Sequence, residues 1–235
     1  MQTLIQVNLL SGGAAQGLVT QIKERFEAQH ACRVISTFGA VGMMKDSLLA
    51  GTPCDVLILT DALVAQLTAS GQLVAGSAGE LGAVKTGIAV KTGDKPVDVS
   101  SPAQLKAVLQ SARGIYFPDP VKATAGIHFM NVLRQLGLET ALSDRLHPFA
   151  NGATAMKAMA EAEGTGLVGC TQGTEILYID GVELVAPLPK EFELATVYTA
   201  AVCAQARQTQ AARDLIALLT SDENAALRLA CGFEA

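Results

Sequence analysis

Residues 10–17 read Leu-Ser-Gly-Gly-Ala-Ala-Gln-Gly, and this glycine-rich stretch decides how the chain folds. An apolar run with the composition of a strand, residues 4–9, comes directly before it. Residues 18–26, whose apolar positions have helical spacing, come directly after it. A strand that turns into a helix over small residues leaves the first backbone N–H groups of the helix without partners. Because these groups and the helix dipole attract negative charge, the stretch predicts an anion-binding turn.

The composition narrows the class of protein. Half of the 235 residues are hydrophobic, which is enough for one large α/β domain or two smaller lobes. Aromatic residues make up 4% and tryptophan is absent, so the aromatic platforms of sugar-binding or base-stacking surfaces are not expected. The formal net charge is −5 and lysine and arginine form no run, which argues against nucleic-acid binding. No apolar stretch approaches the length of a membrane span, so we expect no membrane insertion.

The cysteines and the N-terminus bear on cofactors and on compartment. Five scattered cysteines lack metal-ligand spacing, so we expect no metal site and no disulfide framework. The glycines of the first turn do not match G-x-G-x-x-G, so no dinucleotide cofactor is expected. No basic segment or apolar run precedes the first strand. We therefore expect a cytoplasmic protein if Met1 is the native start, and a periplasmic one if a signal peptide was removed.

Strand and helix patterns alternate along the chain, which predicts a largely parallel α/β architecture. Asp61 is expected to cap the third helix, and Ser101 the fourth, with Pro102 at its first position. The expected strands are 4–9, 32–37, 55–59, 83–90, 114–117, 166–170 and 195–203, and the expected helices are 18–26, 43–50, 61–70, one from 102, 125–136, 153–162, 208–219 and 221–231.

Two strands in this layout cross between lobes, one near residues 84–90 and the other near 195–203. The C-terminal helices then return to the first lobe. We therefore expect one lobe from residues 1–83 plus 204–235, and a second from residues 84–203 that includes both crossover segments.

Three stretches resemble the type II periplasmic-binding-protein fold, in its molybdate-binding-protein-like branch. They are Leu-Leu-Ala-Gly-Thr-Pro-Cys-Asp-Val at 48–56, Tyr-Phe-Pro-Asp-Pro at 116–120 with 124–127, and residues 155–169. The resemblance implies a two-lobed α/β fold with two crossover segments and an interlobe ligand cleft. Molybdate binders of this branch donate from a serine in each of two first-lobe loops. Here those places fall on Ala14 and on Ala40 or Val41, so the resemblance does not favour molybdate.

A second resemblance, at residues 11–13, 169–177 and 187–191, is to the subgroup that contains aconitate isomerase. Its members keep the binding-protein fold and isomerise a small unsaturated tricarboxylate. Three interpretations follow. The first is a solute-binding-type protein that holds a small anion, most favourably an organic carboxylate, at helix N-termini between two lobes. The alternatives are an isomerase of a small unsaturated carboxylate and a molybdate- or tungstate-type oxyanion binder.

The ligand-binding candidates lie where strands turn into helices. Glycine turns donate through their backbone, and polar groups directly after a buried strand lie where open α/β sheets bind ligands. Gln172 is the strongest side-chain donor, Asn151 either caps a helix or contacts the ligand, and Tyr198 either lines the cleft or packs at the hinge. The predicted set is Ser11, Gly12, Gly13, Gly39, Ala40, Thr124, Ala125, Asn151, Thr171, Gln172 and Tyr198. Of these, Thr124 and Ala125 rest on the family resemblance.

Catalysis by an isomerase needs a group that removes one proton and returns another. Glu175 and His128 are the candidate bases, and Asp119 and Cys170 have weaker claims. A carboxylate needs a pKa raised by burial to act near neutral pH. His128 has the alternative of a packing role.

The expected partners follow from the same reasoning. They are a small anionic ligand, a carboxylate or an oxyanion, and an ABC transporter if the chain is exported. Lys122 is a candidate for the positive charge beside the ligand, with a solvated surface lysine as the alternative. We expect a monomer.

Overall fold

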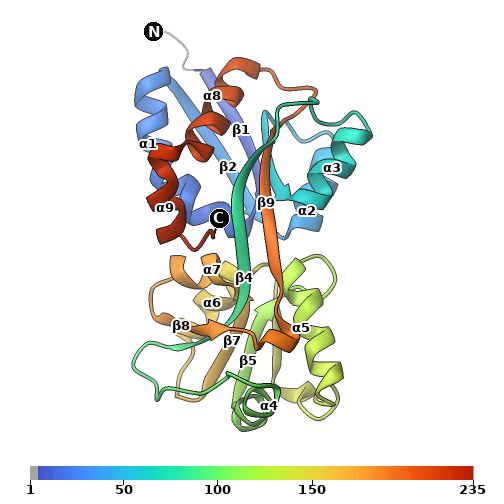
Figure 1. Ribbon diagram of the computed structural model, residues 1–235, viewed down its shortest axis with the longest axis vertical. Helices are drawn as coiled ribbons and strands as arrows, with labels where there is room; N and C mark the ends of the chain where they lie inside the picture. Colours follow the sequence, from blue (N-terminus) through green and yellow to red (C-terminus); the bar gives the residue numbers. More distant parts are fainter. Residues whose placement is uncertain (1–4, 235) are drawn as a thin grey trace. The chain divides into compact units, whose positions relative to one another are not determined.

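A computed structural model describes residues 5–234 (Figure 1). Its contacts divide the chain into two units, Met1–Ala83 with Thr196–Ala235, and Val84–Ala195. We call them unit 1 and unit 2. The chain crosses the boundary within strand β4 (Gly79–Lys91) and again at the start of strand β9 (Ala195–Val202).

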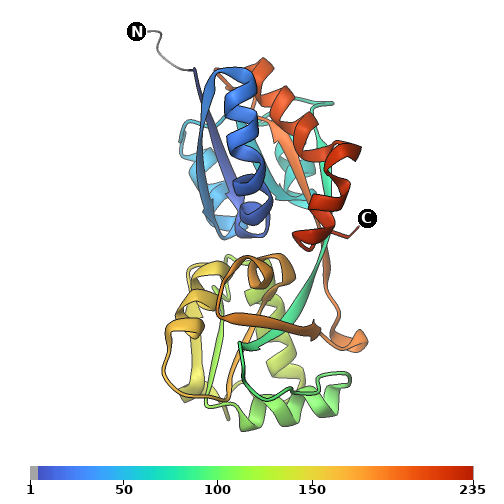
Figure 2. The same ribbon diagram turned by 90° about the vertical axis from the view of Figure 1, so that its left-hand side faces the viewer.

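Unit 1 contains four strands in the order β2-β1-β3-β9. Strand β1 pairs in parallel with β2 and β3, and β9 pairs antiparallel with β3. Helices α1, α8 and α9 lie on one side of these strands, and α2 and α3 on the other (Figures 1 and 2). The further elements are β1 (Ile5–Gly12), η1 (Gly13–Ala15), α1 (Gln16–His30), β2 (Cys32–Gly39), α2 (Val41–Leu49), β3 (Val56–Thr60), α3 (Asp61–Ala69), α8 (Thr209–Thr220), η4 (Asp222–Asn224) and α9 (Ala225–Ala230).

A buried carboxylate ties the two sequence segments of unit 1 together. Asp55, 1% exposed, accepts through Oδ2 from the backbone N–H of Asn8 on β1 at 2.7 Å. Its Oδ1 accepts from the N–H groups of Arg207 at 2.7 Å and Gln208 at 2.9 Å, just before α8. Hydrogen bonds to an ionised group are stronger than neutral ones, so this residue holds the returning chain against the first strand.

Unit 2 contains strands β4, β7, β5 and β6 in that order, with β8 on the other edge of β4. Strand β5 pairs in parallel with β6 and β7, whereas β4 pairs antiparallel with β7 and β8. The further elements are α4 (Pro102–Ser111), β5 (Gly114–Pro118), α5 (Thr124–Gln135), η2 (Ser143–Arg145), β6 (Leu146–Phe149), α6 (Gly152–Glu161), β7 (Leu167–Gln172), α7 (Gly173–Tyr178), β8 (Val182–Pro187) and η3 (Lys190–Phe192).

Each face of the unit 2 sheet has its own apolar core. On one face, Ile88 and Cys170 pack with residues of α4 and α5, including Leu105 and Phe129. On the other, residues of α6 and α7 pack on Ala89 and neighbouring strand residues. The side chain of each strand residue in unit 2 therefore belongs to the α4–α5 face or to the α6–α7 face.

The two-lobed α/β prediction is confirmed, and so is the Ser101 cap, which accepts from the N–H of Gln104 at 3.4 Å. The expectation of a largely parallel arrangement holds for β1, β2 and β3 and for β5, β6 and β7. It is wrong at the crossover strands, because β4 and β9 enter from the other unit and pair antiparallel. Leu4, expected in the first strand, lies outside the described residues.

Three elements escaped the sequence pattern, and one boundary differs. Strand β6 has four residues and includes Pro148, β8 mixes polar and apolar residues, and α7 has six residues. We expected residues 195–203 in the second lobe, but Thr196–Val202 belongs to unit 1. The reason is that β9 pairs with β3 from Val56↔Val202 to Thr60↔Tyr198.

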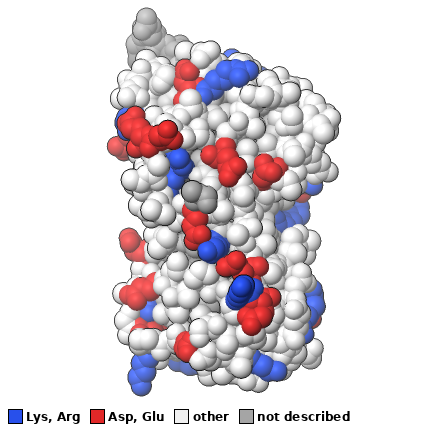
Figure 3. Space-filling view, in the orientation of Figure 1, with Lys and Arg blue, Asp and Glu red and all other residues white. Residues whose placement is uncertain are grey.

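The surface charges and the cysteines of the described residues do not point to a particular functional site. On the face drawn in Figure 3, acidic and basic side chains are interspersed among large uncharged areas. All five cysteines are buried and free. None of the helices formed by the described residues is long and apolar enough to cross a membrane. Within the same residues, no cluster of three histidine, cysteine, aspartate or glutamate side chains is arranged to hold a metal ion.

We predict that Asp55→Ala lowers the free energy of unfolding by about 3 kcal/mol or more, because it leaves several buried N–H groups without an acceptor. Asp55→Asn costs less, since one oxygen still accepts. Urea denaturation followed by circular dichroism measures both. The exposed Asp180→Ala is the control and is expected to change stability by no more than about 0.5 kcal/mol. An Asp55→Ala variant as stable as this control would contradict the role of the carboxylate.

Candidate functional site

In unit 1, three strands end at one edge of the sheet and each leads into a helix. Gly12 at the end of β1 is in register with Gly39 at the end of β2, and both strands run parallel to β3. The residues that precede η1, α2 and α3 are Gly12, Ala40 and Thr60, and none of their side chains forms a capping hydrogen bond. At these three starts the preceding side chain therefore leaves the first backbone N–H groups uncapped, as an anion-binding helix start requires.

Two glycines let the groups at this edge approach closely. A Cβ on Gly12 would lie 2.8 Å from Cγ1 of Val41 and 3.1 Å from Cε1 of Tyr198. A Cβ on Gly39 would lie 2.8 Å from Cε of Met44. The structure thus brings the first turn, the start of α2 and Tyr198 close together, and their role as a shared site stays a prediction.

The side chains at this edge offer fewer hydrogen-bond donors to a ligand than we expected. Ser11 is completely buried, and its hydroxyl donates to the carbonyl of Gly12 at 2.8 Å, so it stabilises its own turn. Asp61 does not cap α3: it is the first helical residue, and its Oδ1 accepts from the hydroxyl of Thr199 at 3.3 Å. Gly13 and Ala40 carry no polar side chain, so they can contribute only through their backbone.

Unit 2 presents a second edge of the same kind, because β5, β6 and β7 are parallel and lead to α5, α6 and α7. Before α5, Asp119 Oδ1 accepts from the N–H groups of Val121 at 2.7 Å and Lys122 at 2.9 Å. The carboxylate of Asp119 therefore holds the loop, which weakens its claim as a base. Thr124 and Ala125 begin α5, whose preceding residue, Ala123, has no capping side-chain bond.

The start of α6 is already occupied by side chains of the protein. Asn151 Oδ1 accepts from the N–H of Thr154 at 2.8 Å and from its hydroxyl at 2.9 Å. Asn151 is thus the helix cap, the first of its two predicted roles. The side-chain oxygen Oδ1 of Asn151 already accepts two hydrogen bonds from Thr154, so it is not open to a ligand.

Glu175, in the first turn of α7, completes this arrangement. The residue is 6% exposed, and its carboxylate accepts from the hydroxyl of Thr171 at 2.5 Å and from the backbone of Gly152, Ala153 and Gln172. A Cβ on Gly152 would overlap both the carboxylate and the Thr171 hydroxyl, so only glycine leaves room for it. Burial raises the pKa of Glu175, while the hydrogen bond from Thr171 and those from the backbone oppose the rise.

The other predicted bases are engaged elsewhere. His128, in α5, lies with Nε2 2.7 Å from the carbonyl oxygen of Phe192, which that ring N–H is placed to donate to. Cys170 is completely buried in the core beneath α4 and α5, and burial raises the pKa of its thiol far above the usual range. Neither side chain belongs to the Glu175 cluster, which we define as Glu175, Thr171 and the start of α6 at Gly152 and Ala153.

Gln172 lies on the opposite face of β7 from Thr171, because successive strand residues alternate. We expected both residues after the strand, but β7 extends to Gln172. Gln172 is 2% exposed, and neither atom of its amide has a hydrogen-bond partner within the described chain. Thr86, its register partner on β4, has an unpartnered hydroxyl as well. The sequence analysis missed Thr86, although a polar residue in a buried apolar strand is a usable signal.

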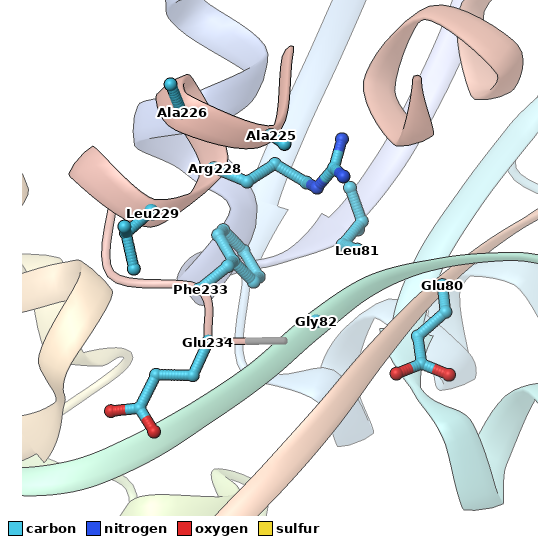
Figure 4. Close-up of a pocket in the computed structure, with 9 residues that line it drawn as sticks. All are labelled: Glu80, Leu81, Gly82, Ala225, Ala226, Arg228, Leu229, Phe233 and Glu234. Atoms are coloured by element: carbon cyan, nitrogen blue, oxygen red, sulfur yellow. The ribbon is translucent and has the colours of Figure 1, made fainter. Parts of the chain in front are cut away.

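A cavity of about 540 Å³ in unit 1 lies between the start of β4 and α9 (Figure 4). Its described lining includes none of the predicted ligand-binding residues. Arg228 donates to the carbonyls of Leu219 at 3.1 Å and Ser221 at 2.7 Å, so its guanidinium group caps the C-terminal end of α8. Glu80 and Glu234 point away from Arg228 (Figure 4). This cavity offers no paired set of groups for an anion.

A family model of bacterial extracellular solute-binding proteins matches residues 7–234. The chain belongs to this family. The expected type II periplasmic-binding-protein fold is confirmed by solved structures that share it. A periplasmic molybdate-binding protein from Azotobacter vinelandii has a TM-score of 0.79 and 17% identity, covering 97% of this chain and 99% of the other. The sulfate-binding protein SubI from Mycobacterium tuberculosis H37Rv has a TM-score of 0.74 and 15% identity, covering 97% and 86%.

A sequence relative lies in the predicted subgroup. This solute-binding protein is 24% identical to aconitate isomerase of a Pseudomonas species in an alignment 232 positions long, which covers 95% of this chain and 86% of the other.

The pH dependence of stability tests the burial of Glu175. Its folded pKa is raised above the ordinary value of 4.5, so the native chain keeps the proton to a higher pH than the unfolded chain does. The protonated Glu175 therefore contributes fully to the stability of the fold at pH values below its ordinary pKa. This contribution is lost as the pH rises through the pKa that Glu175 has in the folded chain. We predict that wild type loses stability relative to Glu175→Gln as the pH rises above the ordinary value of 4.5. Urea denaturation at several pH values measures this difference, and a difference independent of pH would contradict the raised pKa.

Proposed function

We propose that this solute-binding protein binds a small organic carboxylate through backbone N–H groups at the starts of its helices. The observation that carries the proposal is that η1, α2 and α5 begin at the carboxyl edges of parallel strands without capping side chains. A carboxylate oxygen at a helix start meets several aligned donors and the positive end of the helix dipole.

An organic carboxylate suits the chain better than an inorganic oxyanion. A small dianion without apolar surface needs a dense shell of donors. The hydroxyl of Ser11 already donates to the carbonyl of Gly12, and Ala14 and Ala40 have no hydroxyl group. The start of α6 is filled by the carboxylate of Glu175. The molybdate- and sulfate-binding neighbours support an anion as ligand, and the relative named for aconitate supports a carboxylate.

The family supports a place outside the cytoplasmic membrane, which is the periplasmic alternative of the sequence analysis. We propose that the protein delivers its carboxylate to an ABC transporter there. Five buried free thiols are compatible with this location, since burial keeps them from reacting.

A proline substitution at the first position of a helix removes one backbone N–H donor and is tolerated by the helix. Thr124 is the first residue of α5, where proline is tolerated, and Ala123 before it has an extended conformation that proline accepts. We predict that Thr124→Pro weakens citrate binding about tenfold or more relative to Thr124→Ala, which keeps the N–H. Isothermal titration calorimetry with citrate, trans-aconitate, sulfate and molybdate measures the affinities. Equal affinities in the two variants would contradict a backbone donor at this position, and no binding of any of the four anions would contradict the proposed function.

A second candidate is an isomerase of an unsaturated tricarboxylate, favoured by the 24% identity to aconitate isomerase and by a buried carboxyl with a raised pKa. In such an enzyme Glu175 would remove and return the proton, since a pKa raised toward neutrality suits general base catalysis. We predict that an isomerase interconverts cis- and trans-aconitate in an NMR assay and that Glu175→Gln abolishes turnover while citrate still binds. No turnover by wild-type protein that binds citrate would reject the enzyme and leave the binding protein.

A further inference from the structure

Unit 2 contains a group of buried polar atoms that have no partner among the described residues. They are the hydroxyl of Thr86, both amide atoms of Gln172 and the hydroxyl of Thr174. Elsewhere in the described chain, only Ser36 and Thr196 have a buried side-chain oxygen in this condition. Four of the six unpartnered atoms are therefore concentrated at the end of β7 and on its register partner.

The strand register places two of these side chains next to each other. Thr86 on β4 is directly opposite Gln172 on β7, so both side chains lie on the same face of the sheet. The next pair on that face, Ile88 and Cys170, is completely buried in the core beneath α4 and α5. Thr86 and Gln172 thus form the polar end of an apolar layer, at the edge where α5 and α7 begin.

Native proteins rarely leave a buried amide without any hydrogen bond, because both its donors and its acceptor lose their water. The Glu175 cluster does not satisfy this amide, since Thr171 and Glu175 lie on the other face of β7. A bound molecule that supplies the missing partners explains why the chain keeps these groups.

The chemistry of the amide restricts what that molecule carries. The NH₂ group of glutamine donates and its oxygen accepts, so whichever way the amide is turned one of its atoms requires a donor from the ligand. Molybdate and sulfate at neutral pH offer only acceptors. An ammonium is less suitable than a hydroxyl, because the adjacent pair, Ile88 and Cys170, carries no negative charge.

We propose that Gln172 and Thr86 recognise a hydroxyl group and a carboxylate oxygen on the same ligand, so that the protein selects hydroxy acids over acceptor-only anions. This inference rests on the proposed function, which supplies the carboxylate, and adds the hydroxyl to it. The amide NH₂ donates to the carboxylate oxygen, and the amide oxygen accepts from the ligand hydroxyl.

Matched pairs of acids test the proposal by isothermal titration calorimetry. Citrate and propane-1,2,3-tricarboxylate differ by one hydroxyl, and so do malate and succinate. We expect the hydroxylated member of at least one pair to bind about tenfold or more tightly than its partner. Aspartate, with an ammonium in place of the malate hydroxyl, and molybdate are expected to bind no more tightly than succinate.

Variants connect the preference to these side chains. Gln172→Met, close in length and apolar, is expected to bring the affinity ratio of each pair near one, and Thr86→Val to reduce it. Ser36→Ala removes another unpartnered buried hydroxyl, on β2 of unit 1, and is expected to leave the ratio unchanged. Without ligand, Gln172→Met is expected to melt at a temperature equal to or higher than that of wild type, because it removes polar atoms that lack partners.

Each outcome decides a separate point. Equal affinities within both pairs, with carboxylates still bound, would overturn the hydroxyl preference and leave the proposed function intact. A ratio that survives in Gln172→Met, or a clear fall in the melting temperature of the unliganded variant, would show that the amide has partners within the protein. Binding of none of the acids would overturn the proposed function itself.

Discussion

Each α-helix begins with backbone N–H groups that no carbonyl of the same helix accepts, and this constraint organises the chain. The protein satisfies some of these groups itself: Ser101 caps α4, and Asn151 and Glu175 together fill the start of α6. At the carboxyl edges of its parallel strands, η1, α2 and α5 begin without such a side chain. We propose that the open starts of η1, α2 and α5 form the binding surface, whereas the filled starts belong to the framework.

The framework that fixes these open starts depends on two buried carboxylates. In unit 1, Asp55 binds the N–H groups of Asn8, Arg207 and Gln208, so it joins the first strand to the segment that returns from unit 2. In unit 2, Glu175 joins α7 to the start of α6. In both residues the carboxyl oxygens accept from backbone N–H groups, which is the same kind of hydrogen bond that we propose for the ligand.

Local patterns in the sequence were sufficient for most of the fold. The run from the first strand through the glycine turn into α1, and the alternation of later strands and helices, predicted the α/β class. The pattern could not show that β9 pairs with β3, because this pairing joins residues that are 138 to 146 positions apart in the sequence, from Thr60↔Tyr198 to Val56↔Val202. Strand β6 was missed because four residues that include Pro148 are too few for a periodic signal.

The candidate site was predictable in its backbone and less so in its side chains. Gly12, Gly39 and the start of α5 lie at strand edges, as turn chemistry implied, whereas Ser11, Asn151 and His128 have hydrogen-bond partners inside the protein. The partners of a side chain depend on which face of a strand it occupies and on what packs there. For this reason Thr86, whose importance comes from its register with Gln172, became visible only in the structure.

The most direct test of the account is the backbone amide spectrum of ¹⁵N-labelled protein during titration with citrate. We predict that amide protons at the open helix starts, Gly13 and Val41 in unit 1 or Thr124 in unit 2, move downfield where they begin to donate to the ligand. The amide of Thr154, which already donates to Asn151, is predicted to stay in place. Shifts confined to residues around the cavity beside α9, with the three helix starts unmoved, would contradict binding at open helix starts.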